Sequence, residues 1–101
     1  MSIRPGTTKL KDPDGSLFYT WDWQDWLGAA AQIQTSTFLV TGPDAALTTD
    51  NPTIIAGGKS ATVRVLGGTL GATYTLTHRI VTNETPTQGD DRSIFIRVQT
   101  L

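Results

Sequence analysis

Few residues of this chain have side chains that could do covalent or acid–base chemistry. His78 is the only histidine and cysteine is absent, so neither a Cys-ligated metal nor a thiolate nucleophile can form. Ser60 and Ser93 stand in strand-like stretches, and no Gly-x-Ser-x-Gly elbow presents either one as a nucleophile. We therefore predict no catalytic, metal-binding or cofactor-binding residue, and we expect His78 to be a structural or surface residue.

Two short motifs resemble ligand-binding loops, but both lack parts that binding needs. The carboxylates of Asp12, Asp14, Asp22 and Asp25 lie close in sequence, yet a calcium loop needs further oxygen ligands at fixed offsets and a closing glutamate. The stretch Gly57-Gly58-Lys59-Ser60 resembles the end of a phosphate-binding loop, but the first glycine of that motif is missing and no helix follows. Turn formation and helix capping account for the aspartates, and a hairpin turn accounts for the glycines.

Composition argues against several classes of partner. The net charge is -1 and the cationic residues form no stripe, so electrostatic binding to nucleic acid or to an anionic membrane has no support. No apolar run is long enough to span a bilayer and the N-terminus lacks the apolar core of a signal peptide, so we expect a soluble protein made in the cytosol. Threonine and glycine are abundant while glutamate and lysine are scarce, which favours strands over helices.

The predicted strands and turns that carry the histidine, serine and aspartate side chains are organised around the aromatic stretch Tyr19–Leu27. This stretch holds all 3 tryptophans. From Leu17 to Trp23, apolar residues at odd positions alternate with the residues between them, which is the period of a strand whose odd positions face the core. After Trp23 the spacing changes to that of one helical turn, which Asp22 can cap and the following glycine can end. The side chain of Trp26 and its neighbour Leu27 are then expected to close one end of the core.

The tryptophans also permit another interpretation, because sugars stack on exposed indole rings. Trp21 and Trp23 occupy odd positions of the predicted strand, like the other residues expected to face the core, so burial is favoured for both. Trp26 lies outside this alternation. The choice between a core and a sugar-stacking platform therefore depends on how far the indole rings are exposed.

Further strands are predicted where apolar and polar residues alternate between turn-forming residues. The turn signals are Asp-Pro-Asp-Gly at 12–15, Gly-Pro-Asp at 42–44, Asp-Asn-Pro at 50–52 and Gly-Gly-Lys at 57–59. About seven short strands at regular spacing predict an all-β sandwich, because a single sheet would leave one apolar face in water. The predicted strands are Thr8–Lys11, Leu17–Trp23, Ile33–Val40, Thr53–Ala56, Ser60–Leu66, Ala72–Thr82 and Arg92–Leu101, with Leu47–Thr48 as a further short strand.

One domain is expected to hold the whole predicted core. Residues 7–101 form this domain, and a flexible arm at residues 1–6 precedes it. The side chains predicted to build the core are those of Tyr19, Trp21, Trp23, Trp26, Leu27, Phe38, Val63, Tyr74, Leu76, Ile80, Ile94, Ile96 and Val98.

Outward-facing apolar residues are the candidate contacts for a partner. Phe18, Val81 and Phe95 fall on strand faces directed to solvent, and a cluster of such side chains marks a protein–protein surface. Thr87 and Gln88 lie in the polar loop Asn83–Asp91, which is the most adaptable contact segment. Free edge strands offer a second docking route, because another strand can add to them.

The aromatic stretch and the C-terminal strands carry a family resemblance. The matching elements are Lys11–Asp14 with Tyr19–Leu27, then Ile33–Val40, Ser60–Gly68, Gly71–Ile80 and Asp91–Val98. Asp-Trp-x-x-Trp-Leu is the more specific piece, whereas Tyr-Thr-Leu-Thr recurs in many immunoglobulin-like modules. In these elements the chain resembles a family of small tailed-phage and prophage structural proteins, the fiber-tail adaptor or neck-associated proteins.

The resemblance implies an immunoglobulin-like β-sandwich and a virion component made in the host bacterial cytoplasm. It implies several copies per particle and partners among the tail, neck, head-completion and fiber proteins, and it brings no catalytic residue. The leading hypothesis is therefore a non-enzymatic structural protein that bridges parts of a phage particle through surface and edge-strand contacts. A carbohydrate- or cell-surface-binding β-sandwich module is the alternative, and an enzyme is not expected.

Overall fold

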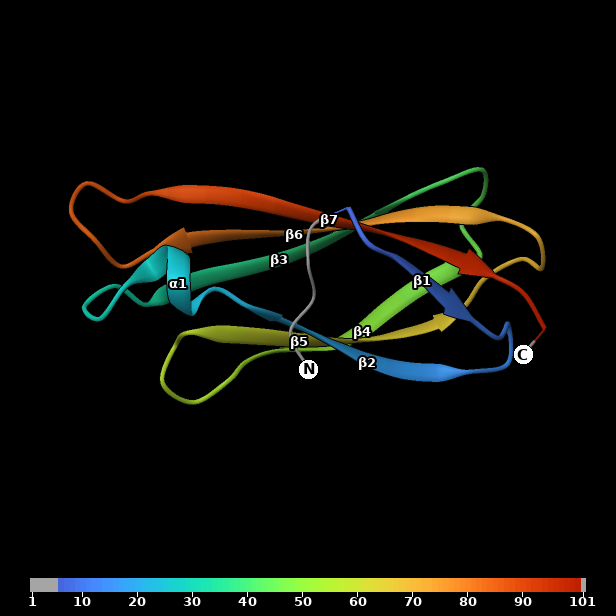
Figure 1. Cartoon of the computed structure of the whole chain (residues 1–101), viewed down its shortest axis with the longest axis horizontal. Coiled ribbons are helices and arrows are strands. Elements are labelled where there is room, and N and C mark those ends of the chain that lie inside the picture. The colour runs from blue at the N-terminus through green and yellow to red at the C-terminus, as the bar shows by residue number, and fades with distance from the viewer. Residues whose placement is uncertain (1–5, 101) are drawn as a thin grey trace.

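Two β-sheets pack face to face in the computed structural model, which describes residues 6–100 (Figure 1). One sheet has four strands in the order β1-β7-β6-β3, and the other has three in the order β2-β5-β4. This arrangement confirms the predicted all-β sandwich, while the immunoglobulin-like topology stays a prediction. The strands are β1 (Thr8–Lys11), β2 (Ser16–Asp22), β3 (Ile33–Thr41), β4 (Leu47–Ile54), β5 (Ser60–Gly67), β6 (Thr73–Thr82) and β7 (Gly89–Val98).

The ends of the chain bear on two further predictions. The arm predicted for residues 1–6 lies outside the described residues except for Gly6, whose backbone N–H donates to the carbonyl of Ser93 at 2.7 Å. Residue 101, the last of the predicted final strand, is likewise not described, and β7 ends at Val98. That residues 7–101 form one domain stays a prediction.

The hairpin of β6 and β7 forms the centre of the four-stranded sheet. Its strands pair antiparallel, with Leu76 opposite Ile94. The hairpin loop is shorter than the predicted Asn83–Asp91, because β7 already begins at Gly89. β3 pairs antiparallel with the other side of β6, and β1 lies parallel to the C-terminal half of β7. Both ends of this sheet order are therefore edge strands, β1 on one side and β3 on the other.

The strand β4 differs from the sequence prediction of two strands separated by a turn at residues 50–52. In the structure, Leu47–Ile54 is one strand whose pairing with β5 shifts register between Asp50 and Thr53. Asn51 adopts a left-handed backbone with φ of 50°, and Pro52 has no N–H to donate to a ladder. An edge strand tolerates such an irregularity because one side of its backbone has no partner in the sheet.

The core lies between the sheets and contains nearly all the side chains predicted for it. Phe38 is half-buried and packs against the core. The prediction is wrong for Trp26, which is 37% exposed because α1 turns its ring over the outside of Trp23, with ring centroids 5.6 Å apart. Leu17 is 42% exposed, although it lies on the same face of β2 as the buried Tyr19 and Trp21. The buried members of the predicted core are Tyr19, Trp21, Trp23, Leu27, Val63, Tyr74, Leu76, Ile80, Ile94, Ile96 and Val98.

The short helix α1 (Gln24–Leu27) follows β2 as the change in spacing predicts. The carboxylate of Asp22 accepts the predicted hydrogen bond from the N–H of Gln24 at 2.9 Å, although the N-cap position is held by Trp23, one residue later. Gly28 ends the turn with a left-handed backbone, φ 71°. The ammonium of Lys59 then donates to the carbonyls of Gly28, Ala29 and Ala31, so a side chain from the β4–β5 hairpin holds the segment after the helix.

Lys11 is a buried charged residue that sequence reasoning did not predict. Its side chain lies between the sheets, and its ammonium donates to the carbonyl oxygens of Gly67 at 2.7 Å and Asp12 at 2.9 Å. Burial lowers the pKa of this ammonium, and the nearby carboxylates of Asp12 and Asp14 oppose that shift. Through these bonds the end of β1 is tied to the end of β5, which belongs to the other sheet.

Candidate protein–protein interface

His78 lies in the core, fully enclosed and held by two hydrogen bonds. The indole N–H of Trp23 donates to its Nδ1 at 3.1 Å. An indole nitrogen is a donor only, so Nδ1 carries no proton and the ring proton sits on Nε2, which lies 2.8 Å from the hydroxyl of Ser36. Burial and, to a smaller extent, the positive charge of Arg92 together lower the pKa of His78 to about 4. The imidazole is thus a neutral connector between the sheets, stacked on Phe38 at 4.3 Å.

Two of the four aspartates considered as calcium ligands accept hydrogen bonds from the backbone. Asp12 accepts from the N–H of Asp14, and Asp22 accepts from the N–H of Gln24, both at 2.9 Å. Over residues 6–100, no group of His, Cys, Asp or Glu side chains is placed to hold a metal ion. The candidate functional features of this molecule are therefore its surfaces.

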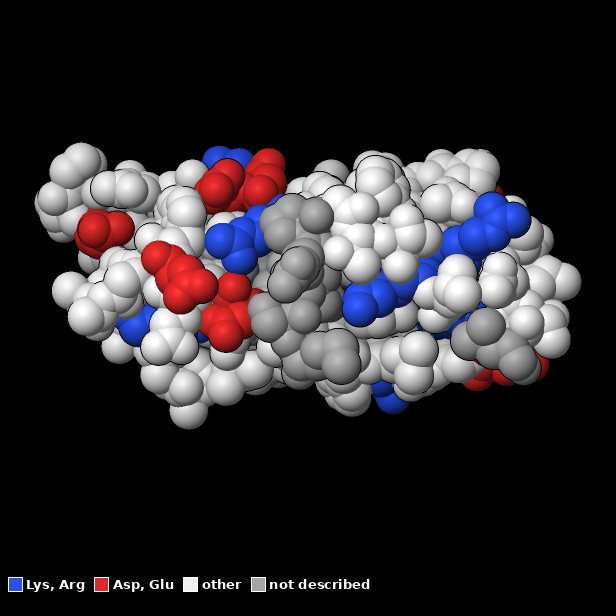
Figure 2. Space-filling model, viewed as in Figure 1, with Lys and Arg blue, Asp and Glu red and all other residues white. Residues whose placement is uncertain are grey.

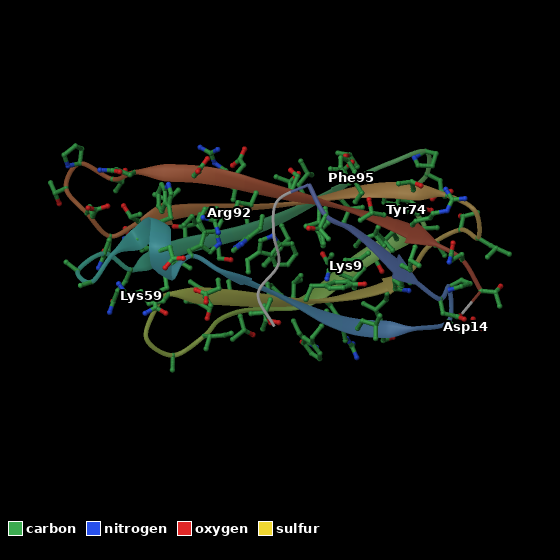
Figure 3. The ribbon with its side chains drawn as sticks, in the orientation of Figure 1. Lys9, Asp14, Lys59, Tyr74, Arg92 and Phe95 are labelled. Atoms are coloured by element: carbon green, nitrogen blue, oxygen red, sulfur yellow. The ribbon has the colours of Figure 1, made fainter. Side chains whose placement is uncertain are left out.

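The outer face of the four-stranded sheet is the most distinctive surface, because its side chains are mainly threonines. Strand registers place these side chains in cross-strand rows. Leu39 lies opposite Thr77, and Thr75 lies opposite Phe95. Figure 3 shows Phe95 on the side of β7 that faces away from the three-stranded sheet. We call this surface the threonine face and define it by Thr8, Leu10, Thr35, Thr37, Leu39, Thr41, Thr73, Thr75, Thr77, Ser93 and Phe95.

Three large apolar side chains stand out of the threonine face. Leu39 is 61% exposed, Leu10 is 48% exposed and Phe95 is 41% exposed. They come from β3, β1 and β7, so they are spread across the sheet from one edge strand to the other. Among them only Phe95 is named by the sequence prediction of partner contacts. Leu10 and Leu39 fall on outward positions of β1 and β3, and the strand pairing that brings them onto one face is not visible in local sequence.

The threonine face carries little net charge at its centre. The hydroxyls of Thr77 and Ser93 bond to each other at 2.8 Å. Beside them, Arg79 and Asp91 form an exposed ion pair at 2.9 Å. A hollow of about 310 Å³ lies here, lined by Thr37, Phe38, Leu39, Thr77, Arg79 and Asp91. The face is thus partly apolar, with one hollow beside the edge strand β3, and its main charge beyond this ion pair is the exposed Arg97, which lies opposite Leu10 and Thr73.

The residues predicted as partner contacts do not form one cluster. Val81 is half-buried on the same outer face as Phe95 but near the hairpin end of β6. Thr87 and Gln88 are exposed in the β6–β7 loop, where the N–H of Gln88 donates to the hydroxyl of Thr82. Phe18 is 59% exposed on the outer face of the three-stranded sheet, on the opposite side of the sandwich. The structure therefore separates them into two faces and one loop.

A model of one protein family matches residues 11–97 of the chain, and its description is "Podophage GP4 fiber-tail adaptor protein gp77". The match covers all seven strands except the first residues of β1 and the last residue of β7. The chain belongs to this family. Comparison with curated proteins and with solved structures gives no match.

This member of the fiber-tail adaptor family is elongated, with principal dimensions of 44 × 22 × 21 Å. Figure 2 shows most acidic side chains of this view on the left, where basic side chains lie among them, and a row of basic side chains on the right along β1, with further acidic side chains at the lower right. Figure 3 places Lys59 and Arg92 at the first end and Asp14 at the second. The strands and the helix concerned carry Asp25, Asp90 and Asp91 at one end and Lys9 and Arg97 at the other. Within residues 6–100, no helix is long and apolar enough to cross a membrane.

Proposed function

We propose that this chain is a non-enzymatic structural part of a phage virion that bridges the tail or neck to fiber or head-completion proteins. The family match over residues 11–97 supports the adaptor role. The finer claims, which are an immunoglobulin-like topology, several copies per particle and synthesis in the host bacterial cytoplasm, belong to the same proposal. Its partners are other virion proteins, with no role for nucleic acid or membrane.

The single observation that carries the contact site is the exposed apolar group on the threonine face. Leu10, Leu39 and Phe95 are large side chains held outward by a paired sheet, so little conformational freedom is lost when a partner covers them. Aromatic side chains are frequent anchors of protein interfaces, and threonine adds a methyl group and a hydroxyl at each position. We therefore assign Phe95 as the anchor of the contact.

The elongated shape fits a part that touches two partners. The hairpin end carries Val81, Thr87 and Gln88 with the acidic side chains, and basic side chains lie along β1 toward the other end (Figure 2). We propose that the hairpin end meets one virion protein and that Phe18, on the opposite sheet, is a second and smaller contact.

The alternative, a carbohydrate-binding module, rests on one tryptophan. Trp21 and Trp23 are fully buried and offer no surface for a sugar to stack on. Trp26 is 37% exposed, but it is a single ring that packs against Trp23 at 5.6 Å between centroids, and neither of the other tryptophans extends it into a platform. The structure thus favours the adaptor role over sugar binding.

A particle-assembly experiment tests the proposed function. Particles assembled without this chain should have tails that lack fibers, and purified chain added back should restore fiber attachment. Phe95→Ser should lower this restoration at least about tenfold, as expected for loss of an interface anchor. Phe18→Ser is the matched control on the opposite face and should have a smaller effect. Fibers that attach normally without the chain would overturn the proposal, and a loss confined to Phe18→Ser would move the main contact to the three-stranded sheet.

A further inference from the structure

The free edge of β3 has the properties of a strand that pairs with another strand. β3 ends the strand order of the four-stranded sheet, so the backbone groups on its outer side have no partner within the sheet. Its sequence, Ile33-Gln34-Thr35-Ser36-Thr37-Phe38-Leu39-Val40-Thr41, contains no charge and no proline. Charges, prolines and bulges are the usual protections of an exposed edge, and β3 has only a small irregularity between residues 33 and 35.

The other edge strands are less open to pairing. β4 carries Pro52, a register shift and the charged Asp50. β1 is only 4 residues long and contains Lys9 and Lys11. β2 is shorter than β3 and ends on Asp22. β3 is therefore the longest edge strand of the described residues, and it carries neither charge nor proline.

One hollow borders β3 on its free side. It has a volume of about 370 Å³ and is lined by Ser36, Pro52, Thr53 and Ile54, so it lies between β3 and the bulged part of β4. The hollow of about 310 Å³ beside Leu39 extends over β6 and β7, so it lies on the paired side of β3 and not at its edge. An added strand points successive side chains to opposite sides, so every second side chain would face the hollow beside Ser36. At the start of the edge the N–H of Ile33 already donates to the carbonyl of Gly58 at 2.8 Å, so we expect pairing along the rest of β3.

We infer that the occupant of this edge is β3 of a second copy, paired antiparallel about a two-fold axis. The two four-stranded sheets then become one continuous sheet. An uncharged strand can face itself without repulsion, and the net charge of -1 adds little repulsion between copies. Outward Thr35, Thr37 and Leu39 are favourable cross-strand neighbours for one another. A two-fold contact of this kind closes at two copies.

This inference rests on the sheet edge alone and does not depend on the proposed adaptor role. An extended segment of a different protein is the competing occupant, and the experiment distinguishes the two. Pairing through one edge buries little surface, so we expect weak association, with Kd on the order of 100 µM. Sedimentation equilibrium from about 10 µM to about 1 mM should show the mass rising from one copy to two.

Charge variants test whether β3 is the edge that pairs. Leu39→Lys and Leu39→Glu should each weaken self-association at least about tenfold, and mixing the two variants should restore it. Leu10→Lys, the same change on the edge strand at the other end of the sheet, is the matched control and should leave association intact. Hydrogen exchange at high concentration should show slower exchange for the backbone amides of residues 35–41.

Two results of these association measurements would overturn pairing between copies through β3. A chain that stays a single copy up to about 1 mM excludes a second copy as the occupant and leaves the edge to a strand of another protein. Association that Leu10→Lys abolishes and Leu39→Lys does not would place the contact elsewhere. Either result leaves the fiber-attachment experiment, which uses Phe95 and Phe18, unaffected.

Discussion

Trp23 donates its indole N–H to Nδ1 of His78 across 3.1 Å, joining the two sheets through a hydrogen bond in the core. The same indole ring lies beneath the guanidinium of Arg92, whose central carbon is 4.0 Å from the ring centroid. A guanidinium over an indole face is attracted by the ring electrons. Protonation of His78 would place a second positive charge beside Arg92 and remove the acceptor for Trp23. The neutral imidazole is therefore part of the folded state.

Stability should consequently depend on pH through His78. Its pKa falls from the ordinary 6.5 to about 4 on folding, mainly because burial disfavours the charged ring. The unfolded chain thus binds a proton at a higher pH than the folded chain does. The free energy of unfolding should be constant above pH 6.5 and should fall by about 3 kcal/mol as pH drops to about 4, measured by urea denaturation.

A variant that does not titrate provides the control for this pH dependence. His78→Gln keeps an oxygen that can accept from Trp23, and its unfolding free energy should be flat between pH 6.5 and 4. The carboxylates of Asp44 and Asp50 have pKa values lowered by their hydrogen bonds, with Tyr74 and Arg64 the main partners, so their contribution is lost only below pH 3.8. An equal slope in the wild type and in His78→Gln would contradict the assignment to His78.

The two tryptophans that touch each other should differ in their effect on stability. Trp23→Ala removes a fully buried ring and should lower the free energy of unfolding by roughly 3–5 kcal/mol. Trp26→Ala removes a partly exposed ring and should cost about 1 kcal/mol. Denaturation in urea, with the midpoint and slope fitted together, measures both changes. Equal losses would mean that Trp26 is part of the core after all.

The hydroxyl of Tyr74 should stabilise the fold through Asp44. It donates to the carboxylate of Asp44 at 2.6 Å and accepts from the N–H of Thr69 at 2.9 Å, which ties two loops at one end of the sandwich. Tyr74→Phe should therefore lower the free energy of unfolding by about 1–2 kcal/mol. Tyr19→Phe is the matched control, because the Tyr19 hydroxyl is buried without a hydrogen-bond partner among the described residues. A loss as large for Tyr19→Phe would contradict the assigned role of the hydrogen bonds.

The proposed contact residues should be dispensable for folding. Phe95→Ser and Leu39→Ser alter exposed side chains on the threonine face, so each should change the free energy of unfolding by under about 1 kcal/mol. The same variants should weaken binding to the partner on the particle. Thermal unfolding followed by circular dichroism separates the two effects. A large loss of stability would mean that these side chains stabilise the folded sheet, and it would contradict their assignment as contacts for a partner.

The sequence predicts the strands with a strong two-residue alternation well and their ends poorly. β5 and β6 follow the predicted parity along their whole length, because one face of each is buried under a complete opposite sheet. Leu17 and Trp26 were expected inside and are exposed. The two-residue alternation tells which face of a strand a residue is on, but it does not tell how much of that face other elements cover.

The features that the sequence did not predict depend on contacts between distant segments. Lys11 is buried because carbonyl groups from a distant strand end and a turn receive its ammonium, and nothing near it in sequence indicates this. The residue types of Asn51 and Pro52 predict a turn. In the structure, the residues on both sides of them pair with β5, so β4 is one continuous strand with a bulge. The threonine face likewise arises from the order of four strands, so local alternation shows Phe95 but not its assembly with Leu10 and Leu39.

The parallel pairing of β1 with β7 has a mechanical consequence. Thr8 stands beside Phe95 and Lys11 beside Val98, so the two strands run in the same direction. A pull on the start of β1 and on the end of β7 then acts along the strands in opposite directions. The hydrogen bonds between them carry this force as shear and must break together, whereas a hairpin pulled at its open end unzips one bond at a time. In the proposed adaptor role, a load applied between the start of β1 and the end of β7 would be resisted by this pair in shear.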